Sequence, residues 1–142
     1  MASRHESRER ALQMLFVWDQ TQQSPEKIIA AYWGGLLAED APGEGLPLRA
    51  VPDDFAAELL CGTVSRAAEC DTLIRTHAEH WRLERMSAVD RNILRLAVFE
   101  LLERQTPAAV VIDEALEVAR RFSGEESVQF VNGVLDAVRR AI

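Results

Sequence analysis

Apolar side chains recur along this chain at intervals of three and four residues, the spacing that places them on one face of a helix. The pattern predicts a first helix that begins at a capping residue, Ser3, and reaches about Thr21. Its apolar stripe is Ala11, Leu12, Leu15 and Phe16. A second helix is predicted to begin at Ser24 and Pro25. Residues 41–52 hold three of the five prolines and predict the longest loop.

Helical periodicity resumes after this loop and continues to the end of the chain. One long helix, or two with a break, is predicted from Asp53 to about His80. Ser87 and Asp90 have the spacing of a helix cap, and the helix over 88–103 that follows is apolar on nearly every side. Two further helices, over about 106–123 and 125–142, complete the pattern. We therefore predict an all-α fold of six or seven helices with the 88–103 helix at its centre.

These helices are expected to form one domain over residues 1–142. Within it, we group an amino-terminal helical subdomain over about 1–80 and a carboxy-terminal helical subdomain over about 81–142. Short links between the helices favour two small bundles. The sequence shows neither internal repeats nor low-complexity tracts.

The charge balance limits the kind of nucleic-acid site that the chain can form. The net charge is -7, whereas a broad RNA-binding surface needs an excess of positive charge facing the phosphates. All the basic residues except Lys27 are arginines, and arginine can both pair with a phosphate and stack on a base. Any RNA site is therefore expected to be local.

Sequence motifs for catalysis are missing from this chain. It has no Gly-rich phosphate loop, no nucleophile elbow and no paired-cysteine zinc pattern. The nearest ligand set is Cys70, His77 and His80, which lacks a fourth ligand, and the alternative is two amphipathic histidines near a helix end. We expect reduced thiols at Cys61 and Cys70, and no catalytic residue, metal or cofactor. We also expect a cytoplasmic protein without membrane contact, because no segment approaches the roughly 20 apolar residues of a membrane span.

The amino end of the first predicted helix departs from the pattern of its own stripe. Continued backwards at 100° per residue, the stripe reaches Arg4 and Arg8, with His5 beside it. Arginines are rarely buried, so we expect these two turns to lie on the rim of the bundle or beyond it. A bound anion would offset the unfavourable interaction of these cations with the helix macrodipole. The alternative is a solvated helix end where Glu6 and Glu9 balance the arginines.

The last predicted helix holds two further departures. Phe130 lies about 100° from the apolar stripe and is expected to be half exposed. It is either a packing contact or a surface on which RNA bases stack. Gly133 lies in mid-helix, where glycine costs roughly 1 kcal/mol relative to alanine, and this predicts the close approach of another helix.

Four segments together resemble one known family. They are residues 8–16 (RERALQMLF), 90–101 (DRNILRLAVFEL), 112–119 (IDEALEVA) and 130–136 (FVNGVLD). In their order and spacing, from near the start of the chain to its end, the sequence is similar to the NusB family of transcription antitermination factors. The resemblance implies a NusB-like fold of six or seven helices in two small bundles, and an RNA-binding adaptor that is not an enzyme.

The resemblance also implies partners. A member of this family pairs with the ribosomal protein NusE, the small-subunit S10 protein, and the pair binds the boxA element of nascent RNA. With NusA and NusG in the transcription elongation complex, it promotes read-through in ribosomal RNA operons. We also keep a homodimer of the chain among its expected assemblies.

Individual residues receive roles from the same resemblance. The RNA contacts on the first helix correspond to Arg4, His5, Arg8 and Arg10. Phe130 and Glu126 match positions near the RNA and partner surfaces, and Asp90 matches an acidic position that meets the basic ribosomal protein. Glu6 and Glu9 interrupt what is often an unbroken basic run in the family, so RNA affinity without the partner is expected to be low.

Two other function classes are weighed against this one. A NusB-like RNA-binding module that precedes an RNA cytosine methyltransferase would make the chain part of an enzyme system. A structural homodimer without an RNA function would leave a labelled boxA RNA unshifted at every protein concentration.

Overall fold

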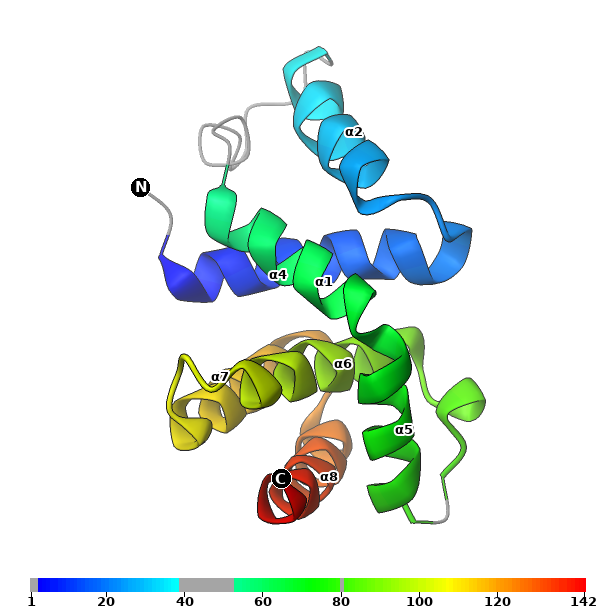
Figure 1. Cartoon of the computed structure of the whole chain (residues 1–142), viewed down its shortest axis with the longest axis vertical. Coiled ribbons are helices and arrows are strands. Elements are labelled where there is room, and N and C mark those ends of the chain that lie inside the picture. Colours follow the sequence, from blue (N-terminus) through cyan, green and yellow to red (C-terminus); the bar gives the residue numbers. More distant parts are fainter. Residues whose placement is uncertain (1–2, 39–52, 80) are drawn as a thin grey trace. The chain divides into compact units, whose positions relative to one another are not determined.

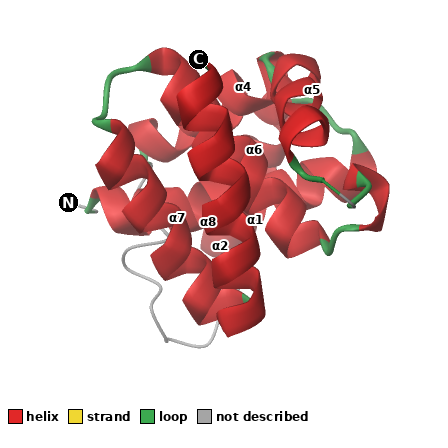
Figure 2. Cartoon of the chain, turned by 90° about the horizontal axis from the view of Figure 1, so that it is seen from below, coloured by secondary structure: helices red, strands yellow, loops and turns green. Residues whose placement is uncertain are grey.

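The computed structural model of the chain describes residues 3–38, 53–79 and 81–142. Within these ranges the chain forms helices joined by loops, with no strand (Figure 2). The all-α prediction is therefore confirmed. The predicted loop over 41–52 and His80 lie outside the described residues. No helix in the ranges above has the length and the apolar character needed to cross a membrane.

The first of two compact units covers residues 1–61 and contains α1 (Arg4–Thr21), α2 (Pro25–Ala38) and most of α4 (Asp54–Ser65), as labelled in Figure 1. The predicted capping box opens α1: the Ser3 hydroxyl accepts the backbone N–H of Glu6 at 3.1 Å, and the Ser3 N–H donates to the Glu6 carboxylate at 3.0 Å. The helix ends at Gln22, which adopts a left-handed conformation with φ 58°. Both predicted bounds of α1 are confirmed.

The core of this unit is formed by one face of each helix. It consists of Ala11, Leu12, Met14 and Leu15 from α1, Ile28 and Trp33 from α2, and Ala56, Leu59 and Leu60 from α4. The predicted α1 stripe was wrong at Phe16, which is 43% exposed. The buried face is centred near Ala11 and Leu15, so Phe16 falls at its edge while Met14 falls within it.

The second unit, residues 62–142, is built around one helix. It contains α5 (Ala67–His77), a 3₁₀ turn η1 (Leu83–Arg85), α6 (Ala88–Glu103), α7 (Ala108–Phe122) and α8 (Glu125–Ala141). Helix α6 packs against α5, α7 and α8, and every residue from Asn92 to Leu101 is buried. This confirms the predicted central position of the helix, and the Ser87 hydroxyl caps it by accepting the Asp90 N–H at 3.1 Å.

The segment predicted as one long helix, or two with a break, is two helices. The break falls at Arg66, where the backbone leaves helical geometry (φ -109°, ψ 17°). The Arg66 guanidinium donates two hydrogen bonds to Glu69 and one to Glu103. The chain divides into the two compact units between residues 61 and 62, within α4, whereas the sequence predicts the division at about residue 80.

Two glycines of the second unit have opposite surroundings. A Cβ atom at Gly62 would lie 2.2 Å from the Phe99 ring, so the Phe99 side chain of α6 packs directly against the backbone of α4 at this glycine. A Cβ atom at Gly133 would meet nothing within 4 Å. The close approach predicted at Gly133 is therefore wrong, because the side of α8 that carries this glycine is exposed.

Candidate nucleic-acid interface

Asp53 joins the start of α4 to the middle of α1. One of its carboxylate oxygens, Oδ1, accepts the backbone N–H of Ala56 at 3.0 Å and caps α4. The other, Oδ2, accepts the Ser7 hydroxyl at 2.7 Å and the Arg10 guanidinium at 2.8 Å. The Arg10 and Asp53 side chains are 8% and 6% exposed, so the ion pair is buried.

These hydrogen bonds decide the charge of Asp53. Burial by itself would raise the pKa of the carboxyl group, but the hydrogen bonds from Ser7, Ala56 and Arg10 outweigh it and lower the pKa below its ordinary value of 3.8. Asp53 is therefore ionised at neutral pH and matches the charge of Arg10.

The expectation that Arg4 and Arg8 lie on the rim of the bundle or beyond it is wrong for Arg8, and Arg10 is buried as well. Arg8 and Arg10 are only 4% and 6% exposed. Arg10 is buried against the opposite charge of Asp53, and the guanidinium carbon of Arg8 lies 5.6 Å from the centre of the Phe55 ring. Sequence periodicity identifies the face on which these arginines lie, but it does not reveal the carboxylate and the ring that meet them there.

Arg4 is the exposed cation of this cluster. Its guanidinium carbon lies 4.0 Å from the centre of the half-buried Phe55 ring, a cation–π contact, and the Arg4 residue as a whole is exposed to solvent. His5 is half exposed, and its Nε2 lies 3.1 Å from the carboxylate of Glu9. The amino end of α1 therefore presents one guanidinium held in place by an aromatic ring.

A second polar cluster lies where α7 passes into α8. Asp90, half-buried in the first turn of α6, accepts the Ser123 hydroxyl at 3.0 Å and the Ser127 hydroxyl at 2.9 Å. The two hydroxyl oxygens lie 2.7 Å apart. Glu126, in the first turn of α8, is exposed. Both acidic residues implied as partner contacts thus lie at helix amino ends of the second unit.

An aromatic pair completes the candidate surfaces. Phe130 is half exposed, as predicted, and its ring centre lies 5.6 Å from that of Trp81, with the ring planes inclined by 60°. Trp81 is 57% exposed. Trp81 was not among the residues predicted from the sequence, although an aromatic residue outside every helical stripe and next to the charged Arg82 was a usable signal.

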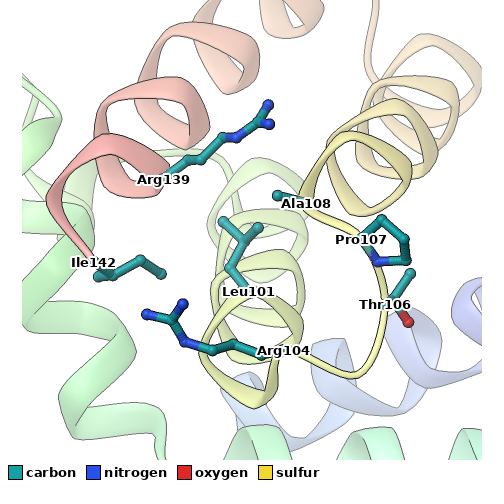
Figure 3. Close-up of a pocket in the computed structure, with 7 residues that line it drawn as sticks. All are labelled: Leu101, Arg104, Thr106, Pro107, Ala108, Arg139 and Ile142. Carbon is teal, nitrogen blue, oxygen red and sulfur yellow. The ribbon is translucent and has the colours of Figure 1, made fainter.

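An open pocket of about 340 Å³ lies among the ends of α6 and α8 and the start of α7. Its lining is Leu101, Arg104, Thr106, Pro107, Ala108, Arg139 and Ile142. Figure 3 shows the guanidinium groups of Arg104 and Arg139 on different sides of the pocket, so they do not converge on a single anion.

The thiols and the histidines offer little for chemistry. Both cysteines are free; burial raises the pKa of the Cys70 thiol to about 12 and also raises that of Cys61. Neither is a thiolate at neutral pH. Among the described residues, no group of three ligating side chains is placed to hold a metal ion, and His80 of the ligand set Cys70, His77 and His80 lies outside them.

In the described residues the fold is all-helical: Arg4, Asp90 and Glu126 lie at helix amino ends, and Trp81, in the loop after α5, contacts Phe130 on α8. The family model described as the NusB family matches residues 5–140. A transcription antitermination protein NusB of Solibacter usitatus is 58% identical over 140 residues, which cover 99% of this chain and 90% of the relative. The chain therefore belongs to the NusB family.

Solved structures agree with this assignment. T. maritima NusB is 32% identical to this chain and superposes with a TM-score of 0.76. The match covers 98% of this chain and 92% of the T. maritima chain. One chain in the structure of antitermination factors NusB and NusE in complex with double-stranded RNA is 24% identical to this chain. The match covers 98% of this chain and 97% of that one. Its TM-score of 0.78 shows a shared fold.

Proposed function

We propose that this chain is a transcription antitermination factor that pairs with ribosomal protein NusE and binds boxA RNA in ribosomal RNA transcripts. The observation that carries the proposal is the family match over residues 5–140. The relatives named as transcription antitermination proteins match this chain along most of their own length. The protein would act on the elongation complex with NusA and NusG, and hence in the cytoplasm.

The RNA contact begins at the amino end of α1. Arg4 is exposed and its guanidinium is held on Phe55, so it meets a phosphate or a base with little loss of side-chain freedom. His5 lies beside it. Arg8 and Arg10 are buried, and their part in RNA binding is to fix this helix end through Phe55 and Asp53.

The partner contact is assigned to the acidic helix ends of the second unit. Asp90 and Glu126 present carboxylates there, and the chain as a whole has a net charge of -7. Such a surface attracts a basic ribosomal protein and repels RNA, so the partner would supply much of the positive charge that holds the RNA.

The proposal is one of binding without catalysis. The two thiols are protonated at neutral pH, and buried polar groups such as Asp53 are taken up by contacts within the fold. An adaptor of this kind needs surfaces that bring RNA and protein together, not a reactive group.

Titration of fluorescently labelled boxA RNA tests the proposal directly. We expect the mixture of this chain with NusE to bind more tightly than either protein alone, because the acidic chain lacks the charge to hold RNA by itself. An RNA with a scrambled boxA sequence is the control. Equal affinity with and without NusE would contradict the proposal.

A further inference from the structure

The segment that carries Trp81 is fixed in a way that holds the indole at the surface. The backbone N–H of Trp81 donates a hydrogen bond to the Ala78 carbonyl at 3.2 Å, which closes a turn after α5. Leu83, only 2% exposed, anchors the segment that follows. The Arg91 guanidinium donates to the carbonyls of Leu83 and Met86 at 3.2 and 3.0 Å. The backbone that carries Trp81 is therefore tied to the end of α5 on one side and, through Leu83 and Met86, to α6 on the other.

The geometry of the aromatic pair leaves ring surface uncovered. Trp81 and Phe130 are inclined by 60°, so neither ring lies flat against the other. Among the side chains that the structure describes, which exclude those of residues 34–38, Trp81 is the most exposed large hydrophobic one. Phe130 comes from α8, so the pair joins two separate segments of the second unit.

The charges around the pair are mixed. Arg82 and Arg85 are exposed on one side of Trp81 in the sequence, and Glu79 is exposed on the other. Glu84 is already paired with Arg75 at 3.1 Å, and Glu126 lies one helical turn before Phe130. Side chains of both charges therefore surround the pair, and they do not form the continuous positive surface that binds a phosphate backbone. A single aromatic pair among charged groups is also unlike the contiguous apolar patch of a protein interface.

We infer that Trp81 and Phe130 form a stacking platform for one unpaired base of the bound RNA, with Trp81 as the main contact. Base–aromatic stacking uses the face of the ring and needs no positive charge, which is what this surface offers. The inference rests on the proposed function and adds to it a base-binding residue that no charge pattern indicates.

Substitutions at Trp81 test the platform in the complex with NusE. Trp81→Ala is expected to weaken boxA RNA binding by on the order of tenfold, while Trp81→Phe retains most of the affinity because a ring remains. The dependence of affinity on salt should stay the same, since no phosphate contact is lost. Phe122→Ala is a matched control: Phe122 is a 42% exposed aromatic on α7, outside the platform, and should bind RNA as the wild type does.

An RNA series locates the stacked base. Each base of boxA is removed in turn to leave an abasic nucleotide, and wild type is compared with Trp81→Ala. At the stacked nucleotide the tenfold difference between the two proteins should disappear, and at the other nucleotides it should persist. A uniform difference along the RNA would overturn the assignment to one base.

A spectroscopic measurement does not depend on affinity. In protein labelled with 5-fluorotryptophan, the Trp81 resonance is assigned by its absence from Trp81→Phe, and it should move when RNA is added to the NusE complex. If RNA binds but this resonance stays fixed and Trp81→Ala binds normally, the inference fails while the proposed function stands. If the wild-type complex does not bind boxA RNA, both fail. If Trp81→Ala weakens NusE binding without RNA, the platform is a protein contact and the inference is overturned.

Discussion

Asp53 and Asp90 are two aspartates at helix starts, one in each unit, and the structure uses them differently. Asp53 is 8% exposed and pairs with a buried arginine, so its charge is committed to holding α1 against α4. Asp90 is half-buried and accepts two serine hydroxyls, which carry no charge. Its negative charge is therefore still available to a partner. The neighbours of a carboxylate therefore decide whether its charge is neutralised within the fold or remains available to a partner.

The largest effect is expected from Asp53→Ala. It leaves Arg10 buried without an opposite charge and removes the cap of α4, so we expect a loss of about 3–5 kcal/mol in the free energy of unfolding. Urea denaturation followed by circular dichroism measures it. Asp54→Ala, at the exposed neighbouring position, is the control and should change stability by less than about 0.5 kcal/mol.

The double variant Asp53→Asn with Arg10→Met sharpens this prediction. It removes both charges together and should recover a large part of the stability that Asp53→Ala loses. No recovery would mean that the ion pair is not the reason for the loss.

The pH dependence of stability is expected to follow from the same pair. The pKa of Asp53 in the folded protein lies below the ordinary value of 3.8, so the unfolded chain takes up the proton first as the pH falls. The stabilisation is fully present above the unfolded-state pKa and is lost as the pH falls through the folded-state pKa. Unfolding in urea between about pH 6 and pH 3 should show this fall, and Asp53→Asn should show less of it. Parallel curves for the two proteins would contradict the assignment.

Asp90→Asn is expected to have a smaller effect on stability and a clear effect on binding. The amide still accepts a serine hydroxyl, so the free energy of unfolding should fall by about 1 kcal/mol or less. If Asp90 contacts the basic partner as proposed, affinity for NusE, measured by calorimetry, should drop because the variant lacks that negative charge. Ser127→Ala, which keeps the charge, is the matched control. A stability loss as large as that of Asp53→Ala would erase the contrast between the two aspartates.

Arg4→Ala should change stability least. Arg4 is exposed and makes its contact on one ring, so we expect less than about 0.5 kcal/mol. Loss of one phosphate contact should lower the slope of log affinity against log salt for boxA RNA by about 1. Arg8→Ala is the comparison within the same helix and should destabilise the fold, since Arg8 is buried. An unchanged salt slope for Arg4→Ala would remove it from the RNA site.

Most of the fold could be predicted because helix signals are local. Caps such as Ser3 and Ser87, and the apolar surface of α6, lie within a few residues of the helices they define. The candidate site was predicted less well because its determinants are distant in sequence. Arg10 and Asp53 are 43 residues apart, and no periodicity reveals that they pair. The pairing of Trp81 with Phe130 could not be predicted for the same reason, because Trp81 lies in the loop after α5 and Phe130 lies on α8.

The contact between Gly62 and Phe99 restricts how this chain can vary. A methyl group at residue 62 would overlap the ring, so Gly62→Ala alone should be selected against even though alanine is the better helix former. A smaller side chain at residue 99 would remove the overlap and leave a void that the methyl group partly fills. The order of change therefore matters: alanine at residue 62 becomes acceptable only after, or together with, a smaller side chain at residue 99.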